Sequence, residues 1–151
     1  MTDYEMIARQ AEALTAGVLH RTANLANVSA LLYDSLEDVN WAGFYLLEGG
    51  RLVLGPFQGK PACVEIPYGK GVCGTAAAED AVQLVPDVQR FSGHIACDSA
   101  SRSEIVLPLH RNGEIFGVLD IDSPLSGRFS EEDRAGLEKV AAVVEAFLVR
   151  E

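Results

Sequence analysis

Long apolar runs and positive charge are both scarce in this sequence. No run approaches the ~20 residues that a membrane-spanning helix needs. Twelve Lys and Arg residues stand against 22 Asp and Glu residues, for a net charge of −10, and the clustered Lys and Arg that neutralise nucleic-acid phosphates are missing. The first five residues are acidic where a signal peptide is basic. We therefore expect a cytoplasmic protein with neither a nucleic-acid nor a membrane partner.

Cysteine is also scarce, with three residues at Cys63, Cys73 and Cys97. The sequence holds no CxxC pair and the cysteine spacings match no zinc-binding motif, so we expect no bound metal. An odd number of cysteines without an export signal argues against a framework of structural disulfides. Two interpretations remain: buried cysteines that pack as small apolar side chains, which is the commoner case, or cysteines with redox chemistry.

Linkers, repeats and low-complexity segments are absent, and 151 residues with 48% hydrophobic content suffice for one domain over residues 1–151. Thr2 and Glu5 form a capping-box pattern that predicts a helix to about Thr15. The three- and four-residue spacing of apolar side chains predicts a second helix, with one face formed by Leu25, Val28, Leu31, Leu32 and Leu36.

Strands and turns alternate after residue 40. Apolar, β-branched and aromatic residues predict strands over 41–47, 52–54, 63–66, 82–85, 105–110 and 114–122. Pro56 and Gly59 end the second strand, and an Ala-rich helix is predicted over 75–78. Asn112 and Gly113 predict a tight turn between the last two strands, and Ser130 caps a final helix. Two helices, an antiparallel sheet and a terminal helix indicate an α+β domain.

The polar loop over residues 93–104 holds a histidine and a cysteine immediately before the strongest strand pattern. A loop of Ser, Ala and Asp needs neither His94 nor Cys97 to connect two elements. Because reactive side chains concentrate on loops that a rigid scaffold positions, we interpret Cys97 as the working thiol of the protein.

Three carboxylates are predicted to meet at one end of the sheet. Asp120 and Asp122 lie two residues apart on one strand and leave the same face. Glu104 begins the neighbouring strand, so antiparallel pairing brings it close to both. An alternative is that the strand simply ends at the surface. A cluster of this kind suits a metal or a small cationic ligand such as an amino group, although no EF-hand spacing is present. One member, kept protonated by its neighbours, could donate a proton.

An acidic cluster raises the pKa of a nearby thiol and so opposes a thiolate nucleophile. A positive group has to offset this effect. The candidates are His94, Arg102 and the ammonium group of a substrate.

Six segments resemble the free methionine-(R)-sulfoxide reductases, which are single-GAF-domain enzymes. They are residues 40–45, 55–63, 69–76, 93–98, 103–108 and 117–123, and they contain all three cysteines and the three carboxylates. The resemblance implies a GAF-like α+β fold, with an antiparallel central sheet on which N-terminal helices and a C-terminal helix pack. It also implies a homodimer that reduces free L-methionine-(R)-sulfoxide to methionine.

The same resemblance implies a role for each cysteine. Cys97 would attack the sulfoxide sulfur and become a sulfenic acid, and Cys63 would resolve it as an intramolecular disulfide. Cys73 would be an additional thiol. No cofactor would be bound; thioredoxin, with NADPH and thioredoxin reductase, would supply the reducing equivalents.

The resemblance further implies that Glu104, Asp120 and Asp122 share two tasks, holding the substrate ammonium and protonating the sulfoxide oxygen. Trp41 would pack against the methyl end of the substrate, with Tyr45 beside it; from the residues alone, Trp41 would be assigned to the core. Two alternatives without turnover remain, a GAF module that binds a small ligand and a redox sensor that uses a Cys97 disulfide.

Overall fold

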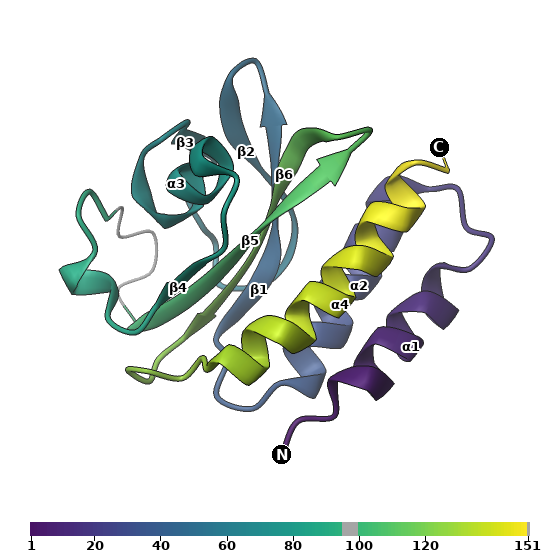
Figure 1. Cartoon of the computed structure of the whole chain (residues 1–151), viewed down its shortest axis with the longest axis horizontal. Coiled ribbons are helices and arrows are strands. Elements are labelled where there is room, and N and C mark those ends of the chain that lie inside the picture. Colours follow the sequence, from purple (N-terminus) through teal and green to yellow (C-terminus); the bar gives the residue numbers. More distant parts are fainter. Residues whose placement is uncertain (95–99, 151) are drawn as a thin grey trace.

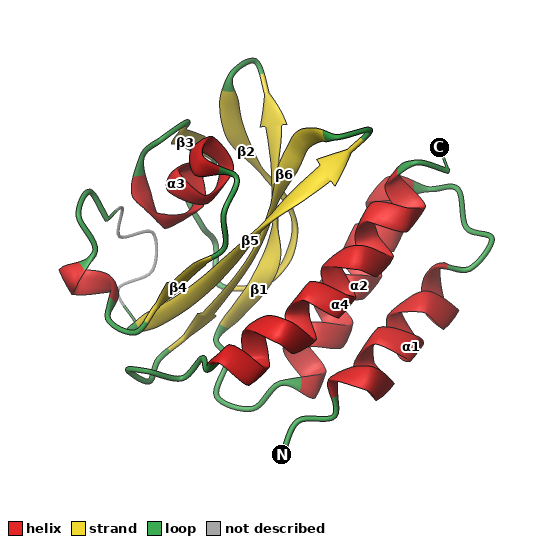
Figure 2. Cartoon of the chain, in the orientation of Figure 1, coloured by secondary structure: helices red, strands yellow, loops and turns green. Residues whose placement is uncertain are grey.

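The computed structural model describes residues 1–94 and 100–150. Its centre is a six-stranded antiparallel sheet in the order β3-β2-β1-β6-β5-β4, and Figures 1 and 2 show helices on both faces. The strands are β1 Trp41–Glu48, β2 Arg51–Gly59, β3 Glu65–Pro67, β4 Gln83–Val85, β5 Ser103–Arg111 and β6 Glu114–Ser123. The helices are α1 Tyr4–Thr15, α2 Arg21–Ser35, α3 Gly71–Glu79 and α4 Glu131–Leu148, with a short 3₁₀ helix at Val88–Arg90.

The sheet separates two apolar cores. Helices α2 and α4 pack on one face, with α1 packed against these two helices, while α3 packs on the other face (Figure 1). The face predicted for the second helix is confirmed, since Leu25, Val28 and Leu32 are almost completely buried against the first core. Fully burying a side chain of this kind contributes roughly 1.5–3 kcal/mol to stability. These contacts therefore hold the helices firmly against the sheet.

The first and last helices, α1 and α4, begin with different caps. Helix α1 is capped by Asp3, whose carboxylate accepts from the Met6 amide at 3.1 Å; the predicted capping box on Thr2 is therefore wrong by one position. Helix α4 has the predicted cap. The Ser130 hydroxyl accepts from the Asp133 amide, and the Asp133 carboxylate accepts from the Ser130 amide at 2.8 Å. An acidic first turn also complements the helix dipole.

Two elements extend beyond their predicted limits by more than two residues at one end. Strand β2 continues through Pro56 to Gly59 because the pairing with β1 shifts between Gly43 and Tyr45, and this irregularity tolerates a proline. Helix α3 begins at Gly71, four residues before the predicted start. A side chain at Gly74 would lie 2.5 Å from the Pro67 carbonyl oxygen, so a glycine, usually unfavourable in a helix, is what allows this close approach.

The β5–β6 hairpin sets the register of the sheet. Its turn residues Asn112 and Gly113 have φ angles of 53° and 80°, as a tight hairpin turn requires. The pairing shifts by one residue between Leu109 and His110, so that Glu104 pairs with Asp122, and β1 pairs Trp41 with Asp122 from the other side. Within the ranges 1–94 and 100–150, no helix is long and apolar enough to cross a membrane.

Candidate active site

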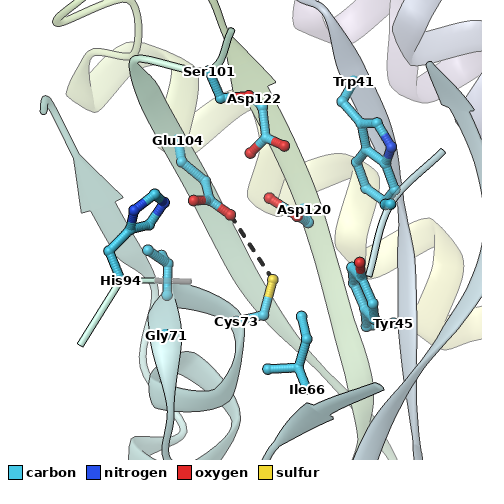
Figure 3. Close-up of a pocket in the computed structure, with 12 residues that line it drawn as sticks. Trp41, Tyr45, Ile66, Gly71, Cys73, His94, Ser101, Glu104, Asp120 and Asp122 are labelled. Carbon is cyan, nitrogen blue, oxygen red and sulfur yellow. Dashed lines mark hydrogen bonds between the residues drawn. The ribbon is translucent and has the colours of Figure 1, made fainter. Parts of the chain in front are cut away.

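A pocket lies between α3 and the sheet, on the face opposite the three large helices. Its walls come from five places: acidic residues of β5 and β6, aromatic residues of β1, the first turn of α3, the ends of the loop that precedes β5, and β3 with the segment before it (Figure 3). Twelve described residues line it: Trp41, Tyr45, Ala62, Ile66, Gly71, Val72, Cys73, His94, Ser101, Glu104, Asp120 and Asp122.

The predicted meeting of three carboxyl groups is confirmed. Glu104 pairs directly with Asp122 across the hairpin, and Asp120 leaves the same face of β6 two residues earlier. Glu104 is 8% exposed and Asp120 is 5% exposed, while Asp122 is half-buried. The three groups gather at the centre of the pocket (Figure 3). The alternative of a strand that simply ends at the surface is therefore wrong.

Asp120 is the most unusual of the three. Burial, followed by repulsion from Asp122 and Glu104, raises the pKa of Asp120 well above its ordinary value. Among the described residues, its Oδ1 atom is buried without a hydrogen-bond partner. A raised pKa favours the protonated carboxyl group, so Asp120 has the properties of a proton donor.

Cys73 brings a free thiol from α3 to the same carboxyl groups. Its Sγ donates to Glu104 Oε2 at 3.9 Å, and the side chain is 4% exposed (Figure 3). Burial, then the charges of Asp120, Glu104 and Asp122, raise the pKa of the Cys73 thiol well above its ordinary value. Because the thiolate is the reactive form, this thiol is not activated as a nucleophile.

Two aromatic residues form the wall opposite the carboxyl groups. Trp41 and Tyr45 are each 2% exposed and stack with ring centroids 5.9 Å apart. The Trp41 indole donates to the Lys60 carbonyl at 3.1 Å, and the Tyr45 hydroxyl donates to the Cys63 carbonyl at 2.8 Å. The wall therefore also anchors the segment that carries Cys63, a link that the sequence patterns did not reveal.

The cysteines predicted to react lie in different positions relative to this pocket. Cys63 is half-buried next to Ala62, which lines the pocket. Cys97 falls within residues 95–99, outside the described residues. His94 and Ser101, which flank that segment in the sequence, both line the pocket.

Of the two basic side chains considered from the sequence, only one is found in the described part of the pocket. His94 lines it, whereas Arg102 is exposed and is not among the lining residues. The sequence analysis did not predict that Ile66 and Val72 line the pocket. Ile66 could have been predicted from the alternation in the third strand, because Ile66 is buried between the exposed Glu65 and Pro67.

Comparisons with known proteins agree with this geometry. The GAF domain family model matches residues 10–148. The chain is 59% identical over 145 residues to the free methionine-R-sulfoxide reductase of Escherichia coli, covering 96% of this chain and 88% of that protein. Among solved structures, reduced fRMsr of Staphylococcus aureus superposes with a TM-score of 0.96 at 52% identity, covering 99% of this chain and 97% of the other. Free methionine-R-sulfoxide reductase from Neisseria meningitidis in complex with its substrate superposes with a TM-score of 0.92 at 43% identity, covering 95% of this chain and 87% of the other. The chain therefore belongs to the free methionine-R-sulfoxide reductases of the GAF domain family.

Proposed function

We propose that this protein reduces free L-methionine-(R)-sulfoxide to L-methionine. The observation that carries the proposal is a single pocket in which three buried or half-buried carboxyl groups face an aromatic wall. Free methionine sulfoxide has a cationic ammonium group and an apolar methyl end, and the pocket complements both. The membership of the chain in the reductase family supports the same substrate.

Recognition of the ammonium group follows from electrostatics. Like charges brought together in a buried site are unfavourable unless a cation joins them. The substrate ammonium supplies that cation between Glu104 and Asp122, while Trp41 and Tyr45 pack against the methyl end of the substrate. A methionine sulfoxide inside a protein chain has an amide in place of the ammonium and is disfavoured in this pocket.

In the reducing step, Asp120 is the proton donor. The Cys97 thiolate attacks the sulfoxide sulfur while Asp120 donates its proton to the sulfoxide oxygen. The S–O bond then breaks, the hydroxyl group passes to the Cys97 sulfur, and methionine leaves with a restored thioether. Cys97 is thereby oxidised to a sulfenic acid and the sulfoxide is reduced by two electrons. The raised pKa of Asp120 favours the protonated form that this step requires.

Regeneration uses the segment held by the aromatic wall. The Cys63 thiol attacks the sulfenic acid and releases water as a Cys63–Cys97 disulfide forms, and thioredoxin then reduces the disulfide by thiol exchange. The Tyr45 bond to the Cys63 carbonyl fixes the backbone at this position. Cys73 remains as an additional, protonated thiol that donates to Glu104.

A thioredoxin-coupled assay that follows NADPH consumption tests the proposal. The wild type is expected to turn over the free R epimer, and Cys97→Ser to show no reduction of it. Cys63→Ser is expected to release one methionine per chain and then to stop. Failure of the fully reduced wild type to turn over the R epimer would exclude the enzyme and favour a module that only binds a ligand or senses redox state.

A further inference from the structure

Three different ligand atoms converge in the pocket, and methionine sulfoxide reduction does not require their combination. The Sγ of Cys73 and a carboxylate oxygen from each of Glu104 and Asp120 all lie within 4.8 Å of one another. All three residues are buried. We propose that the reduced protein also binds one thiophilic divalent cation, with zinc as the biological ion, through Cys73, Glu104 and Asp120.

The spacing of these atoms is close to that of a tetrahedral zinc site. Zinc bonds of about 2.3 Å to sulfur and about 2.1 Å to oxygen place the ligand atoms of a tetrahedron about 3.5 Å apart. The Cys73 sulfur already lies 3.9 Å from Glu104 Oε2. No two of the three ligand atoms therefore have to approach each other by more than about 1.3 Å to close the set around an ion, and all three residues line the pocket.

The chemistry of the donor set selects the class of cation. One sulfur with two carboxylate oxygens suits zinc or cadmium, whereas magnesium and calcium bind through oxygen alone. When the ion binds, the protons of the Cys73 thiol and of the Asp120 carboxyl group pass to solvent, and a sulfur–metal and an oxygen–metal bond replace them, without any change of oxidation state.

A second observation, independent of the spacing, points to a missing cation. Asp120 Oδ1 is buried and unpartnered among the described residues, and the side chain points into the pocket between Glu104 and Tyr45 (Figure 3). Native proteins rarely leave such an atom without a partner. A metal ion would satisfy it. The ion and the substrate ammonium both require Glu104, so the two ligands should exclude each other, a consequence that rests on the proposed function.

Cadmium titration of the full-length double variant Cys63→Ser/Cys97→Ser tests the metal site, because Cys73 is then the only thiol. The ultraviolet thiolate-to-cadmium charge-transfer band is expected to saturate at one cadmium per chain and to disappear when zinc is added. Adding Cys73→Ala should abolish the band, and adding Asp120→Asn should weaken cadmium binding by at least about 10-fold. Glu65 is an exposed acidic residue that pairs with Arg51 outside the pocket. Glu65→Gln is therefore the matched control and should leave the cadmium affinity and stoichiometry unchanged.

The outcomes separate this inference from the proposed function. Absence of the band, or a band of equal affinity in the Asp120→Asn variant with a native circular dichroism spectrum, would overturn the metal site whatever the reductase activity. L-Methionine, which retains the ammonium group, should raise the cadmium concentration needed for half-saturation. A one-equivalent band that methionine does not shift would support the metal site and contradict the placement of the substrate ammonium.

Discussion

The substitution Asp120→Asn is expected to make the protein more stable and nearly inactive. The pocket holds the Asp120 carboxyl group in a buried, anionic environment that raises its pKa well above the ordinary value. Asparagine keeps the size and shape of the side chain, cannot ionise, and brings two N–H donors to neighbours that are carboxylates. The loss of the transferable proton should lower kcat by about 100-fold or more, the usual contribution of a general acid.

The effect on stability has a definite sign and pH window. A carboxyl group with a raised folded pKa binds its proton more tightly in the folded than in the unfolded state, so stability falls as pH rises from the unfolded pKa of about 3.9 to the folded pKa. Each pH unit in this window removes about 1.4 kcal/mol from the free energy of unfolding. Wild type and Asp120→Asn should therefore be similar at pH 4, whereas the variant should be at least about 1 kcal/mol more stable at pH 7.

Urea unfolding of both proteins at pH 4 and pH 7, with kcat measured at pH 7, checks this expectation. A gain of this size corresponds to a melting temperature about 2–4 °C higher. The Glu65→Gln variant controls for the removal of an exposed carboxylate. A variant that is less stable than wild type at pH 7, or that retains near-wild-type kcat, would refute the assignment of Asp120 as a protonated acid.

Two further predictions concern contacts around the pocket. Tyr45→Phe removes the 2.8 Å hydrogen bond to the Cys63 carbonyl. It should lower the free energy of unfolding in urea by about 1 kcal/mol. In stopped-flow assays it should slow disulfide formation and leave the first methionine release unchanged, so equal slowing of both steps would contradict the anchoring role. The His110 ring contacts Asp80 at 2.6 Å and Glu145 at 2.7 Å. Although burial lowers the pKa of His110, these hydrogen bonds raise it overall. Below pH 6.5, His110→Gln should therefore lower the free energy of unfolding by up to about 1 kcal/mol, and the difference should vanish as pH rises through the raised pKa. Melting temperatures that differ equally at all pH values would contradict this prediction.

The sequence predicted the acidic part of the site because the chain constrains it locally. Asp120 and Asp122 share a strand face, and the turn at Asn112 and Gly113 brings the start of β5 next to them. Counted from this two-residue turn alone, however, Glu104 would pair with Ile121, on the opposite face. The irregularity between Leu109 and His110 shifts the pairing by one residue and places Glu104 opposite Asp122, a shift that the sequence patterns did not predict.

The aromatic wall and the α3 side of the pocket depend on long-range packing, which the sequence patterns could not predict. In the sequence, Trp41 looks like an ordinary core residue, since nothing local indicates that its indole donates to the Lys60 carbonyl. The early start of α3 depends on the Pro67 carbonyl lying against Gly74. The raised pKa of Cys73 likewise depends on carboxyl groups from β5 and β6 rather than on its neighbours in the sequence.

The central claim is that the pocket recognises the free amino acid through its ammonium group. The most direct test is kcat/KM for the R epimer of free methionine sulfoxide against its N-acetylated form, measured with the same reductant. Because losing the cation leaves buried carboxylates uncompensated, at a cost of about 3 kcal/mol or more, the account predicts at least about a 100-fold preference for the free amino acid. Comparable values for the two compounds would contradict it.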